Sequence, residues 1–150
     1  MMVAMKTNTP LNVLPGGGKI TNVIGNAITV KVHGRDTGGA FSVIETLDKP
    51  GEGPPPHIQH REDETFYVLE GEYEFTCGML KFIGRAGNTA LLPRGVPHRY
   101  QCISKTSGRL LVVISPAGFE DFFIEADGIN DVGRVVEIGN KYGLEFLPPA

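Results

Sequence analysis

The sequence predicts an all-β protein whose short strands form a sandwich or a closed barrel. Twenty glycines and eleven prolines occur among its 150 residues, and they fall between short apolar runs. Glycine supplies positive φ and proline presets φ, so this distribution is typical of many strands separated by turns. The chain is 41% hydrophobic and has the length of one domain with a buried core.

Eight strands are expected before residue 116, and no helix is expected in that part of the chain. The expected strands cover residues 27–33, 40–47, 65–70, 72–77, 79–83, 89–92, 98–103 and 109–115. The joints between them are rich in glycine and proline, as at residues 34–39, 50–56 and 93–97, which favours turns. Short strands at such regular spacing indicate a sandwich or a barrel.

The pattern changes after the last strand, where two amphipathic helices are expected. Ser115 and Pro116 can serve as N-cap and first position of the first helix. Three phenylalanines then recur at helical spacing over residues 119–123 and form a face that docks on the barrel. The second helix is expected to begin with Asp131 as N-cap and to end near Gly143, before an extended tail.

These elements divide the chain into three parts. Residues 1–10 are expected to form a flexible N-terminal segment, residues 11–126 the barrel with its docking helix, and residues 127–150 the C-terminal helix and tail. No internal repeat is visible, which excludes a chain built from two such barrels.

Composition and charge argue against several classes of protein. The net charge is −3 and the basic residues are scattered, so nucleic acid is not an expected partner. No run approaches 18 apolar residues and the first ten residues lack the apolar core of a secretory signal, so we expect a soluble, cytoplasmic protein without a membrane partner. Cys77 and Cys102 are too few for a disulfide framework and are expected to be reduced.

The residues that indicate chemistry lie in two stretches, 51–71 and 87–98, which resemble the two motifs of the cupin family. The first family motif is glycine, five residues, His-x-His, three or four residues, glutamate, six residues and glycine. The second is glycine, five residues, Pro-x-Gly, two residues, histidine, three residues and asparagine. Eight positions match in type and spacing: Gly51, His57, Glu64, Gly71, Gly87, Pro93, Gly95 and His98.

The flanking sequence is similar to the quercetin-dioxygenase-like subgroup of single-domain RmlC-like cupins. This similarity covers residues 36–41, 66–71, 115–119 and 142–148. The resemblance implies a double-stranded β-helix, or jelly-roll barrel, with one or two short C-terminal helices, and it implies a homodimer. It defines the fold better than the reaction, because cupins include oxygenases, isomerases, decarboxylases and proteins without catalysis.

The resemblance also implies a metal site formed by His57, Glu64 and His98. Two imidazoles and a carboxylate are suitable ligands for one divalent transition metal, which is iron, manganese, nickel, cobalt or zinc. The alternative is a metal-free pocket in which these side chains hydrogen-bond to each other, to Gln59 and to water. Glu62 and Asp63, beside the motif glutamate, are expected to be solvated charges.

Gln59 is the main departure from the family pattern, which has histidine at this position. A strand places residues i and i+2 on one face, so His57 and Gln59 are expected to face the interior while His60 faces away. Gln59 then offers its amide oxygen as a weaker fourth metal ligand. His60 is an alternative ligand, but it reaches the metal only if a bulge follows His57.

The pocket is expected to be mostly apolar, with the polar cluster at one end. The side chains expected to line it are Phe41, Phe66, Val68, Tyr100 and Cys102. Cys102 stands where the family has asparagine, and its thiol either fills space in the core or serves as a soft ligand.

The first functional hypothesis is a dioxygenase-like enzyme that acts on a small aromatic or enolic molecule, with Glu64 also serving as a catalytic base. The second is a metal-poor or metal-free module that binds a small molecule, because Gln59 weakens the metal site. The third is a small-molecule isomerase in which His57 or Tyr100 moves a proton, although the pocket has few basic residues to hold a phosphate.

Overall fold

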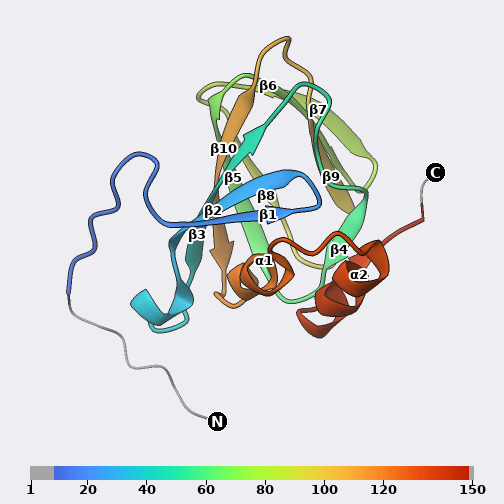
Figure 1. Cartoon of the computed structure of the whole chain (residues 1–150). Coiled ribbons are helices and arrows are strands. Elements are labelled where there is room, and N and C mark those ends of the chain that lie inside the picture. Colours follow the sequence, from blue (N-terminus) through green and yellow to red (C-terminus); the bar gives the residue numbers. More distant parts are fainter. Residues whose placement is uncertain (1–8, 149–150) are drawn as a thin grey trace.

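The computed structural model describes residues 9–148 and shows two antiparallel sheets with helices at one end (Figure 1). The elements in chain order are β1 (Lys19–Val23), β2 (Asn26–Val32), η1 (Gly34–Asp36), β3 (Ser42–Asp48), β4 (His57–Gln59), β5 (Asp63–Glu70), β6 (Glu72–Cys77), β7 (Leu80–Arg85), β8 (Thr89–Leu92), β9 (His98–Cys102), β10 (Gly108–Ser115), α1 (Glu120–Ala126), α2 (Val132–Lys141) and β11 (Leu144–Phe146). Most of the segment predicted to be flexible, residues 1–10, lies outside the described residues.

The strands form one six-stranded and one five-stranded sheet. The first has the order β1-β2-β3-β10-β5-β8, and the second has the order β11-β4-β9-β6-β7. All of these pairings are antiparallel. The prediction of a jelly-roll β-protein with two short helices is confirmed. Strands β1 and β11 were not expected, and β11 lies within the predicted extended tail. Strand β4 was not among the eight expected strands, but it has the alternation that was predicted for His57 and Gln59.

The core lies between the sheets, where alternate residues of each strand point inward. Leu110, Val112 and Ile114 of β10 are at most 1% exposed, and they belong to one buried cluster with aromatic residues of β5 and β6. The ring centroids of Phe66 and Phe75 lie 5.6 Å apart in an edge-on arrangement. This packing fixes which face of β5 looks into the barrel and therefore where its polar residues lie.

The first C-terminal helix begins later than predicted. Ser115 still pairs with Asp63 in the ladder between β10 and β5, so it cannot act as a helix N-cap. Consequently α1 begins at Glu120, after Phe119. The second prediction is correct, because the Asp131 side chain accepts a hydrogen bond from the Arg134 backbone N–H and α2 follows it.

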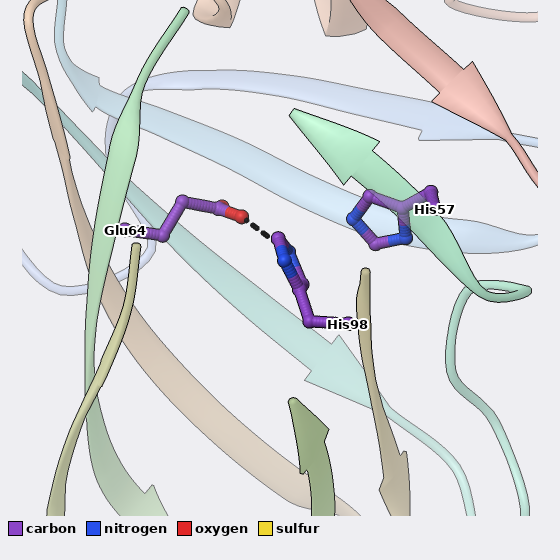
Figure 2. A group of neighbouring side chains, drawn as sticks. All are labelled: His57, Glu64 and His98. Carbon is purple, nitrogen blue, oxygen red and sulfur yellow. Dashed lines mark hydrogen bonds and ion pairs between the residues drawn. The ribbon is translucent and has the colours of Figure 1, made fainter. Parts of the chain in front are cut away.

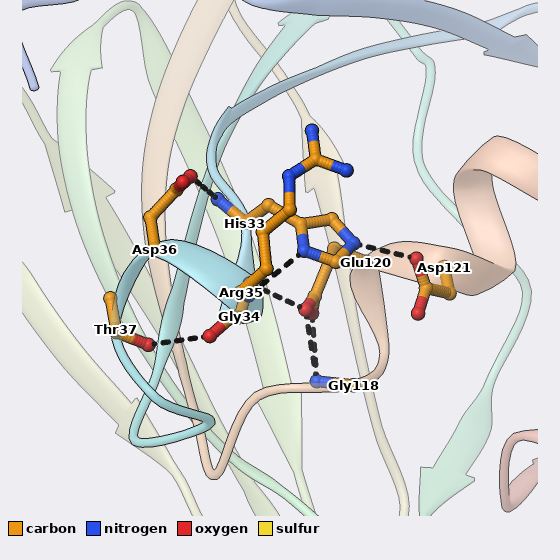
Figure 3. A network of polar contacts seen from close by, with 8 residues as sticks. All are labelled: His33, Gly34, Arg35, Asp36, Thr37, Gly118, Glu120 and Asp121. Carbon is orange, nitrogen blue, oxygen red and sulfur yellow. Dashed lines mark hydrogen bonds and ion pairs between the residues drawn. The ribbon is translucent and has the colours of Figure 1, made fainter. Parts of the chain in front are cut away.

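Hydrogen bonds from the turn after β2 hold the start of α1 against the barrel (Figure 3). The buried Glu120 carboxylate accepts from the backbone N–H of Gly34 at 3.0 Å and from that of Gly118 at 2.8 Å. His33 Nε2 lies 2.8 Å from Asp121 Oδ1. With α1 packed on β1 and α2 packed on β11, the two helices cover one end of the barrel.

Within residues 9–148, neither helix combines the length and the apolar content that crossing a bilayer requires.

A buried polar cluster lies near the end of β3. Asp48 Oδ2 accepts hydrogen bonds from the Tyr73 hydroxyl and from Thr46 Oγ1, both at 2.6 Å. Asp48 Oδ1 is buried without a partner among the described residues, and burial raises the pKa of this carboxyl. The tyrosine donor therefore partners a carboxyl that has few other contacts.

Replacing Tyr73→Phe is expected to lower the free energy of unfolding by about 1–3 kcal/mol, because Asp48 loses a donor in a site closed to water. Urea unfolding followed by circular dichroism measures the change. Tyr67→Phe is the matched control, since Tyr67 is 44% exposed on the outer face of β5 and its loss is expected to cost less than about 0.5 kcal/mol. Equal losses in the two variants would contradict this role.

Candidate metal centre

Three predicted ligands meet between the two sheets (Figure 2). His57 of β4 pairs directly with His98 of β9 in the second sheet, and Glu64 of β5 faces them from the first sheet. One donor atom from each side chain lies within 4.8 Å of the other two. The residues are 7%, 2% and 5% exposed, respectively, so protein rather than water surrounds them.

Backbone carbonyls orient both imidazole rings. His57 Nδ1 lies 2.9 Å from the carbonyl oxygen of Pro55, and His98 Nδ1 lies 3.2 Å from that of Val96. A ring nitrogen that donates to a carbonyl leaves the other nitrogen, Nε2, to accept a proton or a metal. This outer contact is the one typical of metal-binding histidines.

His98 and Glu64 are in direct contact when no ion lies between them. His98 Nε2 is 3.0 Å from Glu64 Oε1, while His98 Nδ1 faces a carbonyl. These two atoms are close enough for a proton or a divalent cation to bind both groups at once.

His57 is a neutral imidazole at neutral pH. Burial, followed by the nearby His98, lowers the pKa of His57 to about 4. The edges of the two rings face each other with centroids 4.4 Å apart. A neutral ring retains the lone pair that a metal ligand needs, and it does so across the physiological pH range.

Gln59 and His60 lie on opposite faces of the chain, as alternation predicts. Gln59 is 1% exposed and its amide lies against the carboxylate of Glu64. The ladder between β4 and β11 shows no bulge, and the His60 side chain is 51% exposed with Nε2 2.9 Å from Glu145 Oε1. The structure therefore places the alternative ligand His60 outside the cluster.

The cluster opens into a cavity of about 350 Å³ between the barrel and the C-terminal helices. His57, Gln59 and Glu64 contribute to its wall, while most of the remaining wall is apolar or aromatic. Both helices contribute: Phe119, Phe122 and Phe123 precede or belong to α1, and Val132, Val135 and Val136 belong to α2. Such a cavity is of the size that holds a small organic molecule.

Two of the five predicted lining residues, Phe66 and Tyr100, line this cavity. Val68 and Cys102 are buried at 1% and 0% exposure but are not part of its wall. The Cys102 thiol lies 3.3 Å from Ser104 Oγ, in the part of the core that also holds Tyr73. It therefore fills space away from the cluster rather than facing a metal.

Phe41 is also placed differently from the prediction. It precedes β3 and is 39% exposed, because the inward positions of that strand are Ser42, Ile44, Thr46 and Asp48. Because the inward side of β3 is mostly polar, the apolar side chains did not mark its buried face, and Phe41 was assigned to the wrong side of the strand.

The structure reveals a further buried carboxyl that the sequence analysis assigned to solvent. Glu62 is only 4% exposed, and its Oε1 has no hydrogen-bond partner among residues 9–148. Burial, followed by the charge of Glu64, raises the pKa of Glu62 to about 7. The i, i+2 relation to Glu64 was the sequence signal for a shared face.

Comparison with known proteins agrees with this geometry. The family model described as a cupin domain matches residues 45–114, which include both motif histidines and the glutamate. Residues 45–114 of this chain are thus a cupin domain.

Among curated proteins, this chain is 32% identical over 73 residues to the quercetin 2,3-dioxygenase of Bacillus subtilis strain 168. The matched segment is 49% of this chain and only 22% of that protein's length. Among solved structures, KdgF from Halomonas sp. superposes with a TM-score of 0.66 at 18% identity, over 75% of this chain and 99% of that one. An RmlC-like cupin from Shewanella frigidimarina NCIMB 400 superposes with a TM-score of 0.63 at 23% identity, over 76% of this chain and 96% of that one. At these identities the structural matches bear on the fold alone.

Glu62→Gln is expected to remove a pH dependence of stability in protein stripped of metal with a chelator. The folded chain keeps the Glu62 proton up to a pKa of about 7, whereas the unfolded chain releases it near the ordinary value of 4.5. Stability of the natural protein therefore falls as pH rises through this window, and the neutral amide does not contribute to that fall.

Urea unfolding at about pH 5 and about pH 8 measures the effect, and the variant should gain stability over the natural protein at the higher pH. Glu70→Gln, at the exposed far end of β5, is the control and should follow the natural protein at both values. If Glu62→Gln changes the free energy of unfolding by the same amount at both pH values, the Glu62 carboxyl is already ionised in the folded chain.

Proposed function

We propose that this cupin domain binds one divalent transition metal through His57, Glu64 and His98, and uses it to act on a small, largely apolar organic molecule. The observation that carries the proposal is a buried His-Glu-His cluster that opens into an apolar cavity. The proposal needs both features, because the cluster supplies a binding site for an ion and the adjoining cavity supplies space for a substrate beside it.

The three side chains suit such an ion in their ligand atoms and in their orientation. Two imidazoles and a carboxylate suit iron, manganese, cobalt, nickel or zinc. The rings are oriented through their Nδ1 atoms by carbonyls, and His57 is neutral, so both Nε2 atoms are directed to ligand or proton binding. When bound, the metal supplies a Lewis acid that polarises a substrate oxygen.

The cavity wall favours an uncharged substrate with an aromatic or enolic group. No lysine or arginine lines this cavity in the described part of the chain, so a phosphate or a remote carboxylate would lack a partner. The aromatic rings at positions 119, 122, 123 and 146 suit a flat apolar body. The oxygens of the substrate would then face His57 and Glu64.

Two chain groups can handle protons in the cavity. Glu64 lies in its wall and can accept a proton from an enol or a phenol as the substrate binds. Tyr100 also lines the wall, and burial raises the pKa of its hydroxyl, so it remains a hydrogen-bond donor. Together they orient a substrate that carries two oxygen atoms on nearby carbons.

The reaction class that we propose is oxygen insertion of the dioxygenase type. Support comes from the relative named quercetin 2,3-dioxygenase, which matches 49% of this chain at 32% identity. The expected homodimer and cytoplasmic location remain predictions.

A metal-poor binding module is the second candidate, and one observation favours it. Without an ion, Glu64 is already partnered by His98 and by the amide of Gln59. Such a carboxylate is stable in the interior without a metal. In that case the cavity would hold a small apolar molecule without transforming it.

The two candidates make different predictions about metal content and oxygen uptake. Protein purified without an affinity tag or chelator should contain near-stoichiometric transition metal by plasma mass spectrometry. His98→Ala should lose it, because one of three ligands is missing, whereas His60→Ala should retain it because that side chain is exposed and paired with Glu145. The metal-loaded protein should then consume oxygen with phenolic or β-diketone substrates, and Glu64→Ala should not.

Metal far below one equivalent in the natural protein and in His60→Ala alike would support the binding module. Unchanged oxygen uptake in Glu64→Ala would contradict the role given to that carboxylate.

A further inference from the structure

The buried amide of Gln59 occupies the position at which the family motif has a histidine. It follows His57 by two residues on β4, lies on the same inward face and is 1% exposed. An amide at such a site must find partners within the protein, because water does not reach it. It lies against the Glu64 carboxylate.

The chemistry of the contact decides which end of the amide faces Glu64. An amide oxygen against a carboxylate would bring two acceptors together, whereas the amide nitrogen supplies donors. With the nitrogen toward Glu64, Gln59 donates to Oε2 at 3.2 Å and also contacts Oε1. The amide oxygen, on the other side of the same carbon, then faces away from the carboxylate.

We propose that Gln59 is a positioning residue that holds the Glu64 carboxylate toward the two histidines, and that it is not itself a metal ligand. This inference rests on the proposed metal site. It implies that the chain supplies three ligands, from His57, Glu64 and His98. The coordination position that a histidine at residue 59 would fill is left for oxygen atoms of the substrate.

The arrangement bears on the class of substrate. An ion with one protein ligand fewer can accept two neighbouring substrate oxygens and a further small ligand together. The cavity begins at this same side of the cluster, since Gln59 and Glu64 both line its wall. The substrate class that fits is a neutral molecule with two oxygens on neighbouring carbons or on carbons one atom apart, such as a catechol, a hydroxyketone or a β-diketone.

Manganese(II) binding to the natural protein, Gln59→Leu and Gln59→Met tests this assignment without any activity assay. Titration calorimetry gives affinity, and the broadening of the manganese EPR signal in ¹⁷O-enriched water gives the number of bound waters. We expect affinity to fall by about 10–100-fold in both variants, the usual loss when the partner of a metal ligand is removed. The number of bound waters should stay the same, because no ligand is lost.

One additional bound water in both variants would overturn the inference, because it would mean that the Gln59 amide had been a ligand. Unchanged affinity would also overturn it, because Glu64 would then need no support. The methionine variant keeps nearly the volume of glutamine, so it serves if the leucine variant does not fold. His60→Ala, on the outward face, is the matched control and should bind manganese as the natural protein does.

Failure of the proposed function gives a different result. In that case the natural protein and His60→Ala would both bind no manganese, and the positioning role would fall with the metal site. Metal binding by the natural protein with either overturning result above would remove the role of Gln59 alone.

Discussion

Glu64 brings a carboxylate into the space between two sheets, where an ionised group without partners is strongly unfavourable. Its neighbours meet that requirement from the other sheet, with His98 Nε2 at 3.0 Å and the Gln59 amide nitrogen against both oxygens. Each partner must therefore occur at an inward position of its strand. The register of β4, β5 and β9 is thus tied to one buried acid, and the candidate metal site follows from that register.

The C-terminal segment adds the second condition, a largely apolar space beside the cluster. Glu120 fixes the start of α1 through two backbone N–H groups, and β11 extends the second sheet by pairing with β4. The helices then lay aromatic and aliphatic side chains over the open end of the barrel. A polar cluster at the edge of such a space can bind an ion and an organic molecule side by side.

The sequence was sufficient for much of this site because strand alternation is a local rule. His57 and Gln59 lie on one buried face and His60 on the other, as the two-residue period requires. The same rule would have placed Glu62 beside Glu64, but its charge suggested solvent. The rule failed for Phe41, because the inward side of β3 holds Ser42, Thr46 and Asp48, so apolar residues did not mark the core face.

Other features depend on contacts between distant parts of the chain. β11 has only three residues in a segment that was predicted to be an extended tail, and it forms a strand because it pairs with β4. The late start of α1 follows from the pairing of Ser115 with Asp63. The hydrogen bonds of Gln59 to Glu64 join two strands of opposite sheets, and no local pattern predicts such a contact.

The three-ligand metal site is tested most directly by anomalous X-ray diffraction from crystals of the cobalt(II)-loaded protein, recorded on both sides of the cobalt absorption edge. We expect one strong peak between His57 Nε2, His98 Nε2 and the Glu64 carboxylate, with no bond to Gln59. A loaded crystal with no peak among these three side chains, or with its peak elsewhere, would show that they do not form the metal site.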